Sequence, residues 1–394
     1  MTSNKVNIFD FATSELSHDA ILCYILSSFN SDVKGDRIIS RKLLSHMIGE
    51  DINYTDQIDC INFDYENDAY SRSENDRKNK RIYNFLIKQK PIYDTNSLSK
   101  VLGFIDIFAE LKIKDKNYSF IIEDKIEANE HGNQLKNYKL AEEDKNENPL
   151  FVFITFGLKS KKFLSKLMNE GWKIIDKDGL ITLFTEVNYE DCSDIIKQYF
   201  DYLSAYNMRK EVFKEKTRPI NKWSGEGRQG FFSFLEDRDE KAQVKMNIVA
   251  WEYVPNQRGG FMGCWFSFLD EVKEEKVKYT PYLQLELSDF VNRIALKISF
   301  GDFDENGKSD KSRERIRDRF HREVAKNKWF KVTRRSMGKT ITIAEVLLGE
   351  SSDSYNTRIH GTPEVLLDDL PHLDDIIKKI EKSISEIKEI FGNG

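Results

Sequence analysis

The sequence has few cysteines, no long apolar run and no large excess of charge of either sign. Its four cysteines, Cys23, Cys60, Cys192 and Cys264, are widely scattered and form no Cys-x-x-Cys pair. This argues against a zinc knuckle or a disulfide framework and favours a reducing compartment. No apolar run approaches the roughly 20 residues that a membrane-spanning helix needs. The N-terminus also lacks a basic segment followed by an apolar one, so we expect no secretory signal and predict a cytoplasmic protein without a membrane partner.

The composition is that of a polar globular protein. With 394 residues, the chain is long enough for two domains. Charged residues make up 32% of it, and the 12% of aromatic residues can fill hydrophobic cores. The net charge of −5 does not by itself argue for nucleic-acid binding. An average of this kind can nevertheless hide a local basic patch.

Strands alternate with helices in residues 1–215, after an initial hairpin, which predicts an α/β domain with a mixed sheet flanked by helices. Residues 68–100 are rich in Asn, Ser, Lys and Arg, and we expect them to form an insertion with some helix around 80–88. The other expected helices are 14–29, 40–49, 131–144, 160–171 and 189–213, and the expected strands are 57–67, 103–112, 118–126, 149–157 and 172–176.

The character of the chain changes after about residue 215. Residues 214–230 contain Pro219 and three glycines and are expected to be a linker. Residues 216–394 are predicted to form a second α+β domain with an antiparallel sheet, which serves recognition, sensing or interaction. Its expected strands lie within 244–254, 263–270, 281–289 and 293–301, its turns at 225–230 and 256–260, and its helices at 311–327 and 372–391.

The expected hairpin of strands 103–112 and 118–126 contains carboxylates where apolar residues are expected. Asp106 lies in the first strand, and Glu123 and Asp124 lie in the second. Side chains alternate between faces along a strand, so Glu123 and Lys125 point one way and Asp124 the other. The hairpin can place Asp106 beside Glu123. Adjacent carboxylates repel each other unless a cation lies between them, and a small set of hard oxygen ligands suits Mg²⁺, with Mn²⁺ as a substitute.

Lys125 could then orient or help deprotonate a water molecule that attacks phosphorus, while the metal stabilises the attacking and leaving oxygens. The alternative is structural. Asp106 stands between two isoleucines, where burial without a partner is costly, and a salt bridge to Lys125 would explain the pair without any catalysis.

The segments "GFIDIFAEL" (103–111) and "FIIEDKI" (120–126) resemble the motif of the PD-(D/E)xK nuclease superfamily. The resemblance covers roughly residues 7–160 and implies a restriction-endonuclease-like fold. It also implies that Asp106, Glu123 and the backbone carbonyl of Asp124 bind the metal and that Lys125 serves the attacking water. Ile105 stands where many members have proline, a departure that the chemistry tolerates.

Two neighbouring segments strengthen the resemblance. "QLKNY" (134–138) is similar to the Gln-x-x-x-Tyr helix of exonuclease-like branches, which implies a site role for Gln134 and a nucleic-acid contact for Tyr138. "ELSHDAIL" (15–22) resembles the first-helix motif of bacterial members, in which a Glu, here Glu15, faces the active site. Alternatively, Gln134 and Tyr138 form a surface pair, and Glu15 is a first-turn charge that faces the helix dipole. His18, one turn on from Glu15, is expected to bond a nearby backbone group rather than act as a catalyst.

A basic stretch in the C-terminal half is separate from these candidate site residues. Residues 308–339 contain thirteen Lys and Arg against four Asp and Glu. Arg315, Arg319 and Arg322 follow one helical face, and Arg334 and Arg335 come later, so we predict that they contact nucleic-acid phosphates. The aromatic residues among them (Phe320, Trp329 and Phe330) could stack on bases or pack inward.

These features together predict a Mg²⁺-dependent phosphodiesterase. By resemblance we expect it to cleave DNA rather than RNA, and we predict an endonuclease that acts on double-stranded DNA. The combination of a nuclease with an unfamiliar second domain suggests a role in bacterial or phage defence or restriction. A homodimer and an activating partner are further expectations. The alternative is a catalytically silent module that binds nucleic acid or dimerises on a nuclease scaffold, and a third hypothesis is a structural adaptor.

Overall fold

The computed structural model describes residues 7–10, 15–61, 86–87, 91–94, 97–125, 134–143, 147–215, 218–255, 260–274, 277–301, 311–333, 338–348 and 373–391. The chain divides into two compact units. The first comprises Met1–Leu158 and Leu164–Asn207, and the second comprises Lys159–Phe163 and Met208–Gly394. None of the helices in the described ranges has the length and apolar character needed to span a membrane.

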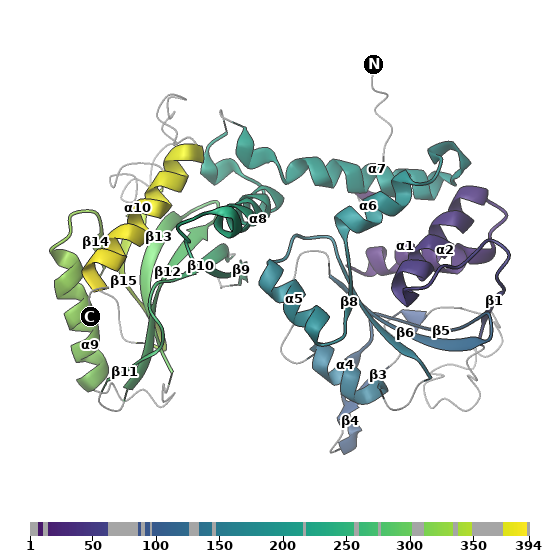
Figure 1. The fold of residues 1–394 in the computed structure, drawn as a ribbon, viewed down its shortest axis with the longest axis horizontal. Coiled ribbons are helices and arrows are strands. Elements are labelled where there is room, and N and C mark those ends of the chain that lie inside the picture. The colour runs from purple at the N-terminus through teal and green to yellow at the C-terminus, as the bar shows by residue number, and fades with distance from the viewer. Residues whose placement is uncertain are drawn as a thin grey trace. The chain divides into compact units, whose positions relative to one another are not determined.

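The first unit is built on a mixed sheet of strand order β1-β5-β6-β7-β8, with β2 paired to β5 (Figure 1). Strand β6 is central: it pairs antiparallel with β5 and parallel with β7. A separate pair, β3 and β4, leads into β5. The strands are β1 Ile58–Cys60, β2 Leu86–Ile87, β3 Pro91–Asp94, β4 Ser97–Phe104, β5 Ile107–Ile113, β6 Lys116–Lys125, β7 Pro149–Thr155 and β8 Lys173–Asp176.

Helices cover both faces of this sheet. On one face, α1, α2, α6 and α7 share a hydrophobic core with alternate residues of the strands, among them Phe120 and Ile122 of β6. Helix α4 approaches the other face, where the side chains of Gln134 and Glu123 meet. The helices are α1 Glu15–Ser27, α2 Lys34–Ile48, α4 Gln134–Glu142, α5 Lys161–Asn169, α6 Lys177–Thr185 and α7 Asp194–Arg209.

The predicted mixed α/β fold of the N-terminal half is confirmed, with local differences. The strand expected over 103–112 is broken, because β4 ends at Phe104, a bend falls at Asp106 and β5 begins at Ile107. Residues 86–87, expected to be helical, form β2, while residues 80–85 lie outside the described ranges. Helix α6 was not predicted, since its nine residues follow β8 without a break.

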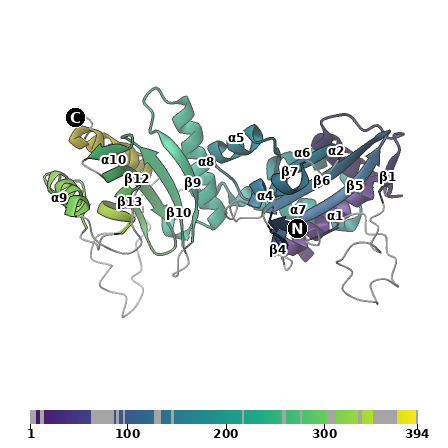
Figure 2. The same ribbon diagram turned by 90° about the horizontal axis from the view of Figure 1, so that it is seen from below.

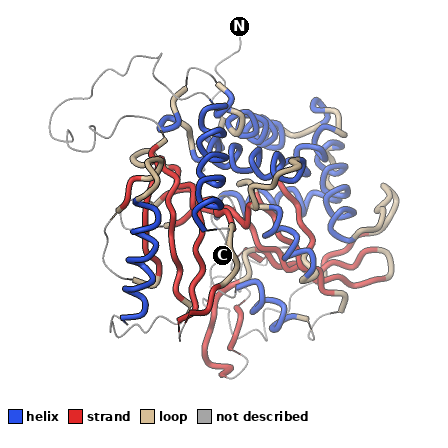
Figure 3. The backbone as a smooth tube through the Cα atoms, turned by 60° about the vertical axis from the view of Figure 1, so that its left-hand side comes forward, coloured by secondary structure: helices blue, strands red, loops and turns tan. Residues whose placement is uncertain are grey.

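The second unit contains the predicted antiparallel sheet, one of the sheets whose strands are red in Figure 3. Its strand order is β14-β15-β13-β12-β10-β9, with β11 on β12. Helices α9 and α10 lie next to each other (Figure 2). Their contact includes a stacked pair of rings, Phe320 and Phe391, whose centroids are 4.4 Å apart. The elements are α8 Gly225–Lys241, β9 Ile248–Val254, β10 Phe261–Ser267, β11 Val272–Glu274, β12 Val277–Leu287, β13 Asn292–Phe300, α9 Lys311–Ala325, β14 Lys331–Val332, β15 Thr340–Leu347 and α10 Leu373–Phe391.

The glycine-rich segment 225–230, predicted to be a turn within a linker, is the first part of α8. The Ser224 hydroxyl caps this helix by accepting a hydrogen bond from the Gly227 amide at 3.1 Å. A Cβ atom at Gly230 would lie 1.9 Å from the carbonyl oxygen of Lys210. Glycine is therefore needed here for a close approach between two segments of the chain, and not for a turn.

Candidate active site

Asp106, Glu123 and Lys125 meet where β6 runs past the start of β5. The last pair in the β5–β6 register is Ile107 with Ile122, so the residues that follow this pair on the two sides are Asp106, just before β5, and Glu123 of β6. The Lys125 ammonium pairs with the Glu123 carboxylate and lies 3.5 Å from Asp106 Oδ2. The structure thus brings together the three residues on which the nuclease hypothesis depends.

The cluster is buried. The exposed fractions of Asp106, Glu123 and Lys125 are 4%, 0% and 4%. Burial, and next the negative charge of Asp106, raise the pKa of Glu123 to about 9, although Lys125 acts in the opposite direction. A cation beside the two carboxylates would favour the ionised form of Glu123 and offset this cost.

The donor set fits a hard divalent cation. Oxygens of Asp106 and Glu123 converge on a single cationic group, the Lys125 ammonium. Among the described residues, no group of three His, Cys, Asp or Glu side chains could hold a metal ion. Mg²⁺ in enzymes of phosphate chemistry is usually bound by one or two carboxylates, with water and phosphate oxygens in the other coordination positions. The carboxylates of Asp106 and Glu123, with the backbone carbonyl of Asp124, match this pattern.

The side chain of Asp124 takes no part in this cluster, as strand alternation predicts, and a role of its backbone carbonyl as a metal ligand stays a prediction. Its carboxylate lies on the opposite face of β6 and pairs with Nδ1 of His18 on α1. Side chains alternate between faces along a strand, so residue 124 cannot share the face of residues 123 and 125. Its backbone amide does contribute, since it donates to Asp106 Oδ2 at 3.1 Å.

His18 was expected to bond a backbone group, but both of its ring nitrogens meet side chains. Nε2 lies 2.6 Å from the hydroxyl of Tyr199 on α7. Burial raises the pKa of Tyr199 well above its usual value, so this hydroxyl keeps its proton. The sequence contains no local signal for the contact, because 181 residues separate the two side chains.

Gln134 and Tyr138 are one turn apart on α4 and face the cluster rather than solvent. Gln134 Nε2 lies 3.0 Å from Glu123 Oε2 and 2.7 Å from the Tyr138 hydroxyl. The Tyr138 hydroxyl donates to the Phe104 carbonyl at 2.6 Å. Tyr138 is only 1% exposed, because the helix–sheet packing covers its ring. Its role as a nucleic-acid contact stays a prediction.

Residues 6–215 match the sequence model of the PD-(D/E)XK nuclease superfamily. The match covers more than half of the chain. The protein belongs to this superfamily. No curated protein and no solved structure matches the chain.

The superfamily match contains every residue of the buried cluster and ends before α8. PD-(D/E)XK nucleases generally use divalent metals, in keeping with the oxygen donors of Asp106 and Glu123. Glu15, the counterpart of the first-helix Glu, is the first residue of α1. Its side chain lies outside the described part of the structure, and its role stays a prediction.

The arginines predicted to contact nucleic acid differ in their surroundings. Arg315 and Arg322 on α9 are exposed. Arg319 is engaged, because its Nη2 lies 2.8 Å from Glu274 and 2.7 Å from the Tyr279 hydroxyl. Arg334 and Arg335 lie outside the described residues.

The aromatic residues of the basic stretch point inward. Phe320 and Phe330 are buried, and Trp329 donates from Nε1 to the Ser383 hydroxyl of α10 at 2.9 Å. Phe320 and Trp329 thus contact α10, and the burial of Phe320 and Phe330 favours the alternative that these rings pack inward.

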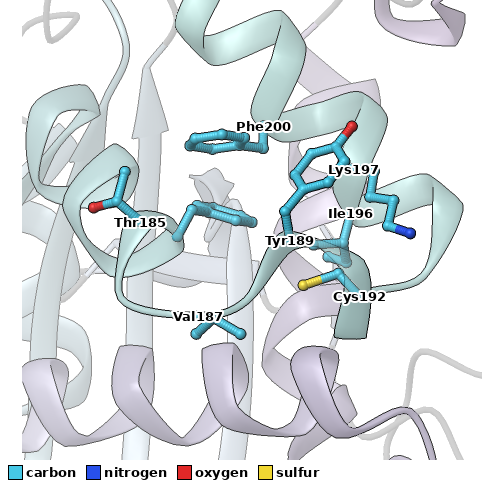
Figure 4. A pocket seen from close by; sticks show the side chains of 8 residues that line it. Thr185, Val187, Tyr189, Cys192, Ile196, Lys197 and Phe200 are labelled. Atoms are coloured by element: carbon cyan, nitrogen blue, oxygen red, sulfur yellow. The ribbon is translucent and has the colours of Figure 1, made fainter.

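A pocket of about 220 Å³ lies in the first unit beside α6 and α7 (Figure 4). Burial raises the pKa of the Cys192 thiol in its wall, so this thiol is a weak nucleophile. The lining residues are Phe184, Thr185, Val187, Tyr189, Cys192, Ile196, Lys197 and Phe200. They include none of the predicted site residues, and the pocket is separate from the carboxylate cluster.

Proposed function

We propose that the protein is a Mg²⁺-dependent nuclease that hydrolyses phosphodiester bonds at the Asp106–Glu123–Lys125 cluster. The observation that carries this proposal is the convergence of two buried carboxylates on the Lys125 ammonium, within the residues that match the superfamily model. A salt bridge alone would need one carboxylate for one lysine, whereas here two carboxylates share one cation.

Each residue has a distinct role in this proposal. Asp106 and Glu123 hold the metal, which when bound stabilises negative charge on the attacking and leaving oxygens. Lys125, in contact with both carboxylates, orients the attacking water and stabilises the charge that develops on it. Gln134 donates to Glu123 Oε2, so the other carboxylate oxygen stays directed at Lys125.

DNA is the proposed substrate, cut internally, in a defence or restriction role. The support is the superfamily membership of residues 6–215, together with the exposed arginines of the second unit. A homodimer, an activating partner and Mn²⁺ as a substitute metal remain predictions.

The proposal is tested with purified full-length protein on supercoiled plasmid, linear duplex, single-stranded DNA and RNA, each with Mg²⁺, Mn²⁺ or EDTA. We expect cleavage of DNA that requires a divalent metal and stops in EDTA. Linearised or nicked plasmid would indicate internal cuts, whereas progressive shortening of linear DNA would indicate cuts from the ends. Salt-sensitive binding without cleavage under any condition would contradict the nuclease proposal and favour the silent binding module.

A second prediction concerns the exposed arginines. We expect the double substitution Arg315→Gln/Arg322→Gln to weaken DNA binding. The magnitude of the slope of log K against log [salt], where K is the association constant for DNA, should fall by about 2, because each phosphate contact contributes roughly 0.9 to it. Fluorescence anisotropy at several salt concentrations measures this slope.

The matched control for this double substitution is Arg317→Gln on the same helix. The Arg317 guanidinium already pairs with Asp318 at 2.8 Å, so we expect a smaller change in slope per charge removed. An unaltered slope in the double variant would exclude these two arginines from the nucleic-acid interface.

A further inference from the structure

Three buried side chains from distant parts of the chain form a continuous hydrogen-bonded series behind the cluster. Asp124 of β6, His18 of α1 and Tyr199 of α7 are 0%, 5% and 0% exposed. His18 Nδ1 meets the Asp124 carboxylate, and His18 Nε2 meets the Tyr199 hydroxyl at 2.6 Å. The His18 ring also lies edge-on to Phe156, with 3.6 Å between ring centroids.

The chemistry of the three groups fixes the direction of the hydrogen bond to Asp124. A carboxylate accepts hydrogen bonds and a neutral imidazole donates from one nitrogen and accepts at the other. His18 Nδ1 therefore donates to Asp124. When the ring is neutral, the Tyr199 hydroxyl donates to Nε2, and when it is protonated, Nε2 donates to the hydroxyl. Because rotation of any member would leave a buried polar atom without its partner, the series resists rearrangement.

The hydrogen-bonded series ends on the part of β6 that no longer pairs with β5. Residues 123–125 extend beyond the last β5–β6 pair, although they still pair with β7. On the open side, the Asp124 amide donates to the side chain of Asp106 instead of to a strand carbonyl. The orientation of this peptide therefore depends on Asp106 at the open edge of β6 and on the contact that the Asp124 side chain makes on one face of the sheet.

We propose that Tyr199, His18 and Asp124 form a positioning device that holds the Glu123–Asp124–Lys125 segment against Asp106. His18 and Tyr199 touch neither substrate nor metal and act through Asp124. Anchoring the Asp124 side chain on the far face keeps its amide on Asp106 and keeps Glu123 and Lys125 directed at the same carboxylate. The consequence for catalysis rests on the proposed nuclease function, whereas the consequence for the geometry of β6 does not.

Two variants test the device. Tyr199→Phe removes a single hydroxyl, and His18→Asn retains a donor near the position of Nδ1 while it loses the contact to Tyr199. The control is Leu203→Val, one turn further along α7, which disturbs the same hydrophobic core but leaves the three polar groups unchanged. All variants are studied as full-length protein.

The first readout is amide hydrogen exchange, which does not require activity. Relative to the Phe120 amide within the β5–β6–β7 ladder, we expect the Asp124 amide to exchange about tenfold faster in Tyr199→Phe and His18→Asn. The second readout is Mg²⁺ affinity by calorimetry, which we expect to fall about tenfold, in line with the loss of outer partners of metal ligands. The kcat at saturating Mg²⁺ should fall as well, with the KM for DNA little changed.

The outcomes separate the two proposals. If both variants behave like Leu203→Val in exchange at Asp124 and in Mg²⁺ affinity, the positioning device is wrong. If the Asp124 amide is released in the variants but the wild-type protein neither binds Mg²⁺ nor cleaves DNA, the nuclease proposal fails and the structural role of the series stands. A twofold or smaller effect of Tyr199→Phe, with a large effect of His18→Asn, would remove Tyr199 from the device.

Discussion

Replacement of Lys125 by Met is expected to lower the rate of metal-dependent cleavage by about 10³-fold, because it removes the cation that serves the attacking water in the proposed mechanism. Methionine keeps much of the length and volume of the side chain, so we expect the buried site to remain packed. Single-turnover cleavage at saturating DNA measures the loss. Circular dichroism and thermal melting establish that the variant is folded.

Asp106→Asn distinguishes a metal ligand from a residue that serves the water. We expect Mg²⁺ to raise the melting temperature of the wild-type protein and of Lys125→Met, since a ligand that binds the folded state stabilises it. Asp106→Asn should lose both this rise and the cleavage. The control is Lys177→Met, which removes a buried ammonium that lies 4.6 Å from the Tyr206 ring centroid. Full cleavage by Lys125→Met would contradict the assignment of the active site.

Gly230→Ala is expected to destabilise the second unit by about 3 kcal/mol or more, because overpacking at a rigid contact forces the backbone to move. The added Cβ would lie 1.9 Å from the Lys210 carbonyl oxygen and 2.9 Å from its carbonyl carbon. Neither atom belongs to a flexible side chain, so α8 and the segment that contains Lys210 must separate. Urea denaturation, followed by tryptophan fluorescence and by circular dichroism, measures the loss.

Gly225→Ala is the matched control on the same helix. A Cβ at Gly225 meets nothing within 4 Å, and alanine favours the helix over glycine by up to about 1 kcal/mol. We expect this variant to be as stable as the wild type or slightly more so. Equal stability of the Gly230→Ala and Gly225→Ala proteins would show that the close approach at Lys210 is not maintained in solution.

Local patterns in the sequence were sufficient for much of the candidate site. Two-residue alternation along β6 placed Glu123 and Lys125 on one face and Asp124 on the other, as the structure has them. The hairpin with β5 then brought Asp106 alongside. The same kind of reasoning predicted the mixed sheet and the antiparallel sheet, because periodicity and turn residues act over a few positions and are visible in the chain itself.

The role of individual side chains depended on the tertiary structure. Helical spacing puts Gln134 and Tyr138 on one face of α4, but it does not say that this face meets the sheet, where Tyr138 is buried. Likewise, a glycine-rich segment is typical of a turn, and the approach of Lys210 that requires Gly230 comes from a contact between different segments.

The sequence by itself thus determined which residues are the candidates for the proposed chemistry: a pair of carboxylates and a lysine at a spacing that strand geometry brings together. The tertiary structure decided what holds them in place. His18 and Tyr199 are 181 positions apart, and they meet behind β6, where His18 also contacts Asp124, because α1 and α7 cover the same face of one sheet. Contacts of this kind arise from the packing of whole elements, for which no short stretch of sequence carries a signal.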